Sequence, residues 1–258
     1  MRPSTSLLSC LALLAWALPL HAQDDVDGTE PTAEFHMARM IYSDGGAANR
    51  GRYGFRRGWW AIDYPEAEIH FHGGVTRLTN VDMAEDSHHI DLMSEALFDH
   101  PWLFVQQVGQ GYWEPSDEEA ARLREYLLKG GFLVIDDFHS EREWPIMERA
   151  MRKVLPAHNI VTLDPSRDEV FHTLYDLDAL TQIPGERHVR CGSMVAYMEG
   201  PARWSGIYDD EGRLMVAIDF NMDVGDAWEH ADDPCYPEPM TALAYRFGIN
   251  YLIYAMTH

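Results

Sequence analysis

The stretch GGFLVIDDFHSE (residues 130–141) decides the fold, because an unbroken apolar run ends in two aspartates, a histidine and a glutamate. The run from Phe132 to Ile135 is apolar at every position, which is typical of a strand buried on both faces in a parallel sheet. In open α/β sheets, ligands bind outside the carboxyl ends of such strands. The sequence therefore predicts a site where the run ends, at Asp136, Asp137 and His139.

Helix and strand patterns alternate on both sides of this stretch. The residues SDEE (116–119) form a capping box, which predicts the start of a helix that ends at Gly130. Apolar runs predict strands at residues 36–42, 69–72, 102–106, 132–136 and 160–163, and helical spacing predicts helices at 59–68, 117–129, 143–154 and 240–255. This alternation predicts a doubly wound, mainly parallel α/β sheet.

A β-hairpin is predicted closer to the carboxyl terminus. Two apolar strands, residues 203–208 and 213–220, flank the turn DDEG (209–212). The second strand ends in a polar loop, NMDVGD (221–226), just as the run at the centre of the chain does. We therefore expect three loops to converge on one crevice at the carboxyl edge of the sheet: those that follow strands 36–42, 132–136 and 214–220.

The amino terminus has the pattern of a secretory signal peptide. Arg2 precedes an apolar run at residues 7–18, and Leu20-His21-Ala22 is a small-residue cleavage pattern. Residues 1–22 are therefore interpreted as a signal peptide, residues 23–34 as a disordered acidic leader and residues 35–258 as a single domain. The mature protein is expected in the periplasm or outside the cell, without a transmembrane segment.

The charge of the chain excludes one class of partner. The 258 residues include 20 Lys+Arg and 42 Asp+Glu, a net charge of −22, and removal of residues 1–22 leaves 19 basic residues and a charge of −23. Binding to phosphates depends on a basic surface, so a nucleic-acid partner is not expected. The expected partner is an unknown polar small molecule or polymer, or an envelope protein.

Two cysteines, Cys191 and Cys235, remain in the mature chain. In an oxidising compartment they are candidates for a disulfide. The alternative is a pair of unpaired buried thiols, because the sequence does not show whether the two residues meet in space.

Carboxylates and a histidine after the two buried strands are the types of residue that hold a divalent metal. We predict Asp137, His139 and Asp223 as metal ligands and Glu229 as a candidate catalytic base. The alternative is that Asp136 or Asp137 caps the next helix, while the acidic residues between 226 and 233 form a solvated face. A second set of candidate ligands is histidines: His70, His72, His88 and His89.

Further residues near these strand ends are candidates for binding a polar ligand. Bidentate arginine contacts suit carboxylates and phosphates, although the arginines of residues 50–57 are equally suited to neutralising the acidic loops. The predicted ligand-binding residues are Tyr42, Asp44, Arg52, Arg56, Asp136, Asn221 and Asp226.

Six segments together resemble the bacterial domain of unknown function 4159 family over about residues 35–258. They are RMIYSDGG, WWAIDYPEAE, HPWLFV, LLKGGFLVIDDF, NMDVGDAWE and FGINYLIYAMTH. The resemblance implies a flavodoxin-like, class I glutamine amidotransferase-like fold, here with an added C-terminal β-hairpin. Amidotransferases use a cysteine nucleophile on a strand-to-helix elbow, and the sequence contains no matching G-x-C-x-G motif. The resemblance therefore implies a fold more firmly than an activity.

Three functions are consistent with these patterns. The first is a secreted protein that binds a polar ligand without the amidotransferase nucleophile. The second is a metal-assisted hydrolase of an envelope or extracellular polymer, with Glu229 as the base. The third is an envelope scaffold that docks a partner protein through an apolar, tryptophan-rich surface.

Overall fold

The computed structural model describes residues 33–43, 58–110, 113–189, 191 and 198–258. Residues 33–258 form one compact unit. The predicted signal peptide, most of the predicted acidic leader, and Asp44, Arg52 and Arg56 lie outside the described residues. Among the helices of the described ranges, none is both long and apolar enough to cross a membrane.

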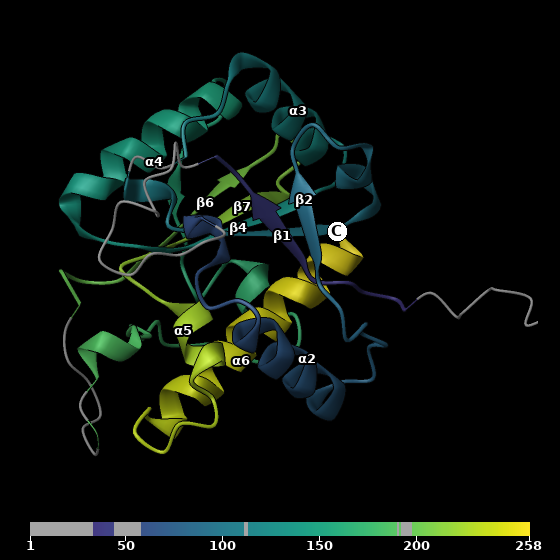
Figure 1. Cartoon of the computed structure of the whole chain (residues 1–258). Coiled ribbons are helices and arrows are strands. Elements are labelled where there is room, and N and C mark those ends of the chain that lie inside the picture. Colours follow the sequence, from purple (N-terminus) through teal and green to yellow (C-terminus); the bar gives the residue numbers. More distant parts are fainter. Residues whose placement is uncertain (1–32, 44–57, 111–112, 190, 192–197) are drawn as a thin grey trace, which may run out of the picture. The chain divides into compact units, whose positions relative to one another are not determined.

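A seven-stranded, mostly parallel sheet forms the centre of the α/β fold, with the strand order β2-β1-β3-β4-β7-β6-β5 (Figure 1). Strands β2, β1, β3, β4 and β7 run parallel, whereas β6 pairs antiparallel with both β7 and β5. The strands span Ala38–Ile41 (β1), His88–Asp91 (β2), Trp102–Gln106 (β3), Phe132–Phe138 (β4), Val161–Thr162 (β5), Arg203–Tyr208 (β6) and Leu214–Phe220 (β7).

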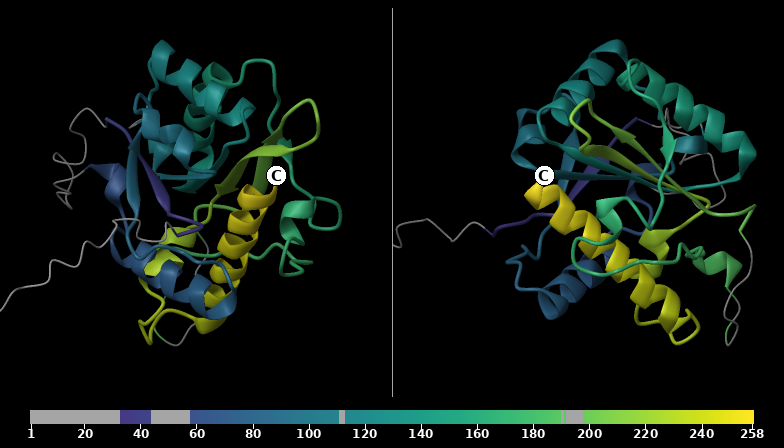
Figure 2. Two further views of the ribbon diagram at one scale, coloured as in Figure 1. Left: turned by 90° about the vertical axis from the view of Figure 1, so that its right-hand side faces the viewer. Right: turned by 180° about the vertical axis from the view of Figure 1, so that it is seen from behind.

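Helices cover both faces of this sheet, as Figures 1 and 2 show. Helices α3 and α4 pack on one face, and α2, α5 and α6 pack on the other. Neighbouring residues of β4 point into different cores, since Val134 packs with the α6 side and Ile135 with the α4 side. The helices span Glu66–Leu78 (α2), Asp117–Leu128 (α3), Ser140–Val154 (α4), Val224–Glu229 (α5) and Glu238–Thr257 (α6).

Several sequence predictions are confirmed. The Ser116 hydroxyl accepts a hydrogen bond from Glu119 N, and the Glu119 carboxylate accepts one from Ser116 N at 2.7 Å, which completes the capping box of α3. Helix α3 is followed by Gly130, which has a φ of 112°. The predicted hairpin is formed by β6 and β7, and the buried run at the centre of the chain is β4, which continues to Phe138.

The predicted strand at residues 69–72 is wrong. These residues lie inside α2, because the buried side chains Ala67, Phe71 and Val75 recur every four positions and form one helical stripe. His70 and His72 are two positions apart in a helix, so they do not share a face as the strand interpretation required. The helix predicted at residues 59–68 is also wrong in its limits, since a 3-10 turn occupies Trp59–Ala61.

Strand β2 and four of the 3-10 turns were not predicted from the sequence. Strand β2 has only one buried residue, Ile90, so it carries no apolar run. Four further 3-10 turns occupy Glu95–Asp99, Val108–Gln110, Glu169–Phe171 and Glu186–His188.

Candidate functional site

The carboxyl ends of β1, β3, β4 and β7 meet at one edge of the sheet, because these four central strands are parallel. The end of β4 carries Asp136 and Asp137, and the loop after β7 carries Asp223. Side chains that are far apart in the sequence therefore lie together at this edge.

Asp136 anchors helix α5 to the sheet. Its fully buried carboxylate accepts hydrogen bonds from Val224 N and Gly225 N, each at 2.9 Å. Burial, and then the neighbouring Asp219 and Asp137, raise its pKa well above the usual value for aspartate. Asp136 thus holds the amino terminus of a helix, as the capping alternative predicted. The helix is α5, however, and not α4, which is the next helix in the chain.

Asp137 and His139 form a buried pair beside this anchor. The Asp137 carboxylate accepts a hydrogen bond from Gln107 Nε2 at 2.5 Å, and its other oxygen lies 2.7 Å from His139 Nε2. His139 Nδ1 is buried and has no hydrogen-bond partner among the described residues. One ring nitrogen of His139 is thus held by a carboxylate, and the other has no partner in the part of the chain that the structure describes.

Asp223 and Asp226 come from the loop after β7 and the first turn of α5. The Asp223 carboxylate caps α5 by accepting a hydrogen bond from Asp226 N at 3.1 Å. The Asp226 carboxylate accepts one from Glu186 N at 2.7 Å. Both carboxylates are therefore held by backbone N–H groups, and that of Asp223 lies close to Asp137.

Asp63 joins the site through a hydrogen-bonded relay. Its carboxylate accepts a hydrogen bond from Gln106 Nε2, and Gln106 Oε1 accepts one from Arg39, both at 2.5 Å. Arg39 is itself fully buried and pairs with the carboxylate of Glu68 at 2.5 Å. The charge of Arg39 is therefore balanced by Glu68, so Asp63 gains a dipolar partner rather than a counter-ion.

Three overlapping sets of side chains have the geometry to hold a cation. In each set, one ligand atom from every residue lies within 4.8 Å of the others. Asp223 belongs to two of the sets, and Asp226 links the second set to the third. The sets are Asp137, His139 and Asp223; Asp63, Asp223 and Asp226; and Asp226, Glu229 and His230.

Negative charge accumulates in this buried network. Burial, and then repulsion by neighbouring carboxylates, raise the pKa of Asp63 and of Asp223 well above the usual value for aspartate. Burial and the nearby Asp226 raise the pKa of Glu229 to about 7. Carboxylates placed together in this way are stable only when they bind protons or a cation.

Two glycines allow the backbone to approach these carboxylates. A Cβ at Gly185 would lie 2.6 Å from Asp223 Oδ2, and a Cβ at Gly225 would collide with Gln106 Nε2 and Asp63 Oδ2. Any other residue at either position would displace a buried polar group of the network.

Backbone strain is concentrated at the same edge of the sheet. A positive φ is uncommon for residues other than glycine, and such conformations cluster at functional sites. In the described ranges, the non-glycine residues with positive φ are Asp63, Gln107, Asp137, Ser140 and Asn221, with values from 50° to 69°. All five lie within or beside the hydrogen-bonded network.

Of the predicted site residues that the structure describes, six come together in the acidic network, and Tyr42 and Asn221 border it. Asp136, Asp137, His139, Asp223 and Asp226 meet at the carboxyl edge, and Glu229 joins them through Asp226. Tyr42 is buried, and its hydroxyl donates a hydrogen bond to Gln106 O at 2.9 Å. The Asn221 amide accepts from Ser140 N and donates to Pro201 O, so its polar atoms already have partners in the fold.

Sequence reasoning did not identify Asp63, Gln106 and Gln107. Gln106 is the last residue of the predicted strand at residues 102–106 and Gln107 follows it, so their position at a strand end was the signal that would have found them. Asp63 lies between β1 and α2, and its approach to the site depends on Gln106 and on the close contact at Gly225.

A disulfide between Cys191 and Cys235 decides between the two alternatives for these cysteines. It links the segment after the 3-10 turn Glu186–His188 to the loop before α6. The residues just before that turn are held to the site by the hydrogen bond from Asp223 N to Ile183 O at 3.0 Å. The disulfide therefore fastens a segment that borders the acidic network.

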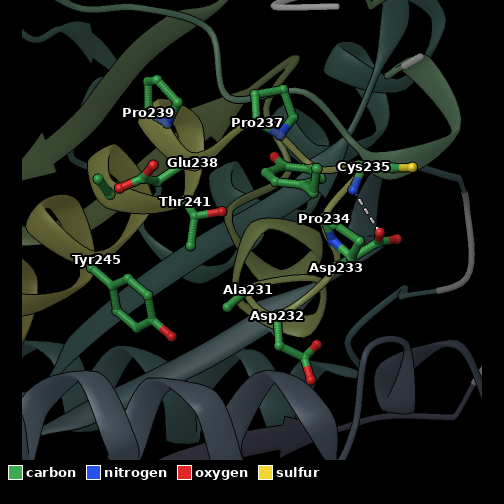
Figure 3. Close-up of a pocket in the computed structure, with 12 residues that line it drawn as sticks. Ala231, Asp232, Asp233, Pro234, Cys235, Pro237, Glu238, Pro239, Thr241 and Tyr245 are labelled. Atoms are coloured by element: carbon green, nitrogen blue, oxygen red, sulfur yellow. Dashed lines mark hydrogen bonds between the residues drawn. The ribbon is translucent and has the colours of Figure 1, made fainter. Parts of the chain in front are cut away.

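A cavity of about 640 Å³ lies beside Cys235, against the first turns of α6 (Figure 3). Its lining includes the side chains of Asp232, Glu238 and Tyr245, but not those of Asp137, His139 or Asp223. The loops after β4 and β7 thus meet through hydrogen bonds, while this cavity lies at a different place; residues 44–57 of the third predicted loop lie outside the described residues.

A family model described as Domain of unknown function (DUF4159) matches residues 47–256 of the chain. The chain belongs to the DUF4159 family. No curated protein sequence matches it. The DUF4159 match contains the acidic network from Asp63 to Glu229, whereas Tyr42 precedes it.

Proposed function

We propose that this DUF4159 protein binds a polar ligand at the carboxyl edge of its sheet through a divalent cation held by Asp137, His139 and Asp223. The observation that carries the proposal is the meeting of three buried ligand atoms, from two separate strand ends, within 4.8 Å of one another. The buried, unpartnered Nδ1 of His139 supports it independently of the acidic residues.

The chemistry of the ligands favours a metal such as Mn²⁺ or Zn²⁺. Carboxylate oxygens suit hard cations, and an imidazole nitrogen extends the choice toward first-row transition metals. A bound cation would also offset the repulsion between carboxylates which, together with burial as the larger cause, raises the pKa of Asp63 and Asp223. Three protein ligands leave coordination positions for the oxygen atoms of a polar ligand.

We also propose a flavodoxin-like, class I glutamine amidotransferase-like form of the α/β fold, without the amidotransferase nucleophile. The pairing of Cys191 with Cys235 supports this, because a disulfide sulfur is not available as a thiolate.

The same disulfide supports export to the periplasm or beyond, since such bonds persist mainly in oxidising compartments. We expect the exported protein to be cleaved near Ala22, and amino-terminal sequencing of that protein measures this.

A metal-assisted hydrolase acting on an envelope or extracellular polymer is the second candidate function. Glu229 favours it, because a pKa of about 7 suits a general base at neutral pH. In this reaction Asp137, His139 and Asp223 would hold the cation, which would supply Lewis-acid activation of a water molecule, and Glu229 would accept the proton of that water and pass it to the leaving group of the cleaved bond. The network reaches Glu229 through Asp226, which lies in one cation-binding set with Glu229 and in another with Asp223.

Metal binding is tested by elemental analysis of protein purified without chelator or affinity metal, and by calorimetric titration with Mn²⁺. The Asp137→Asn, Asp223→Asn double variant should bind at least ten-fold more weakly than the wild type. The control is Asp178→Asn, Asp210→Asn, which removes the same charge from exposed positions. Equal Mn²⁺ affinity in all three proteins, each folded by circular dichroism, would refute the metal site.

The hydrolase is tested separately with Glu229→Gln. This variant should retain Mn²⁺ binding and lose at least a hundred-fold in polymer-cleaving activity, because it keeps the three ligands but removes the base. Loss of Mn²⁺ binding together with activity would instead assign Glu229 to the cation site.

A further inference from the structure

A group of three histidines and one aspartate lies at the opposite edge of the sheet. His88 is the first residue of β2, His36 precedes β1 by two residues, and His100 precedes β3 by two residues. Strands β1, β2 and β3 are parallel, so these three positions share the amino edge. Asp86 lies in the turn that leads into β2.

His36, Asp86 and His88 form a compact set. The rings of His36 and His88 stack with their centroids 4.6 Å apart and their planes 18° apart. One carboxylate oxygen of Asp86 lies 3.7 Å from His36 Nδ1, and the other lies 3.6 Å from His88 Nε2. One ligand atom from each residue lies within 4.8 Å of the other two. His36 Nδ1 is buried and has no hydrogen-bond partner among the described residues.

His100 holds the second nitrogen of the His88 ring. Its Nε2 lies 3.1 Å from His88 Nδ1, a distance that requires a hydrogen on one of the two nitrogens only. His100 is 7% exposed, so its ring is held in place within the fold beside His88. When His100 accepts the hydrogen from His88 Nδ1, the lone pair of His88 Nε2 faces Asp86 and is free to bind a metal. Metal-binding histidines in proteins are usually oriented by such a partner on the other ring nitrogen.

We propose that His36, Asp86 and His88 bind a divalent transition metal of borderline softness, Zn²⁺ above all, and that His100 positions the His88 ring. Two imidazoles and one carboxylate suit Zn²⁺ and Cu²⁺ better than Mg²⁺ or Ca²⁺. The Asp86 side chain is 74% exposed, so the site is open to solvent and leaves a coordination position for an outside ligand. This second metal site is separate from the oxygen-rich site at the carboxyl edge and does not depend on it.

The site is tested by Zn²⁺ titration of the untagged protein in competition with a chromophoric chelator. The wild type should bind one more equivalent of Zn²⁺ than the His36→Asn, His88→Asn double variant. The matched control is His172→Asn, which removes a histidine that is 2.9 Å from an aspartate, Asp176, on another surface. The control should bind as much Zn²⁺ as the wild type. Equal stoichiometry in the wild type and the double variant would overturn the proposal.

Two milder variants keep the test decisive if the double variant does not fold. Asp86→Asn changes an exposed side chain and should weaken Zn²⁺ binding at least ten-fold. His100→Phe keeps the ring volume but removes the hydrogen-bond acceptor, and it should weaken binding about ten- to a hundred-fold without changing the stoichiometry. Unchanged affinity in Asp86→Asn would contradict the ligand set.

Spectroscopy with Cu²⁺ separates ligation from a merely structural role. The electron paramagnetic resonance spectrum of the protein with one equivalent of Cu²⁺ should show coupling to the nitrogens of two imidazoles. The coupling should persist in the Asp137→Asn, Asp223→Asn variant, because those residues lie at the other edge of the sheet. A nitrogen coupling that disappears in that variant would place the Cu²⁺ at the carboxyl edge and overturn the assignment.

Discussion

Asp219 shows how a single buried carboxyl group makes the stability depend on pH. It lies in β7, is fully buried and accepts a hydrogen bond from the Tyr251 hydroxyl at 2.8 Å. Burial raises its pKa from 3.8 to about 7. Between these two values the unfolded chain loses the proton that the folded protein keeps, so the free energy of unfolding falls as the pH rises.

We expect Asp219→Asn to be more stable than the wild type at neutral pH, because asparagine can accept the Tyr251 hydrogen bond without titrating. The difference should be small near pH 4 and grow to at most about 4 kcal/mol above pH 7. Urea unfolding at pH 4, 5.5 and 8 measures it. A difference that does not change with pH would show that the Asp219 carboxyl is already ionised at low pH.

Gly225 tests how closely the backbone must approach the acidic network. A methyl group at this position would collide with Gln106 Nε2 and Asp63 Oδ2, so we expect Gly225→Ala to lower the stability by about 1–3 kcal/mol. The control is Gly73→Ala in α2, where the added methyl meets no atom within 4 Å. That change should raise the stability by about 0.5–1 kcal/mol. Thermal unfolding compares the two, and a neutral effect of Gly225→Ala would mean that the network can rearrange.

At the scale of elements, α3 is stabilised at its amino terminus by side chains that the sequence alone identifies. Ser116→Ala removes a hydroxyl that accepts from Glu119 N, and it should lower the stability by about 1 kcal/mol. Because the two side chains cap each other reciprocally, Glu119→Ala should cost less in the Ser116→Ala background than in the wild type. A double-mutant cycle by urea unfolding gives the coupling, and strict additivity would contradict a reciprocal cap.

Elements with a strong local pattern were predicted, and those defined by tertiary contacts were not. Strand β4 was predictable because each position of Phe132–Ile135 is apolar, and α3 because its cap is encoded within four residues. Helix α2 was missed because the alternation of Ile69-His70-Phe71-His72 resembles a strand over four residues, whereas the helical stripe becomes visible only over nine. Strand β2 is half exposed and is held mainly by its pairing with β1.

The site was predictable to the extent that topology determines it. Asp137 and Asp223 were predicted to be neighbours because parallel strands end at a common edge, and the structure brings them together. Asp63 was missed because its place follows from the Arg39–Gln106 relay, which joins residues 43 and 67 positions apart in the chain. A hydrogen-bonded network of this kind leaves no local pattern in the sequence.

At the scale of the whole molecule, the disulfide joins residues 44 positions apart. Closing a loop of this length restricts the unfolded chain, so we expect Cys191→Ala, Cys235→Ala to lower the stability by about 2–4 kcal/mol. Urea unfolding with and without reductant is the measurement. Reductant should destabilise the wild type by a similar amount and leave the double variant unchanged. A wild type that is insensitive to reductant after complete reduction would contradict the expected contribution.

The five non-glycine residues with positive φ in the described ranges indicate that stability is sacrificed for function at the carboxyl edge. Each such backbone conformation costs on the order of 1–3 kcal/mol, so together they take up a sizeable part of the stability of a domain. The substitutions Gln107→Gly and Ser140→Gly would remove that conformational cost, yet the chain has larger side chains at both positions. In a selection for thermal stability alone, Gln107→Gly and Ser140→Gly should therefore appear early. The most heat-stable variants should be those that no longer bind a ligand at the carboxyl edge.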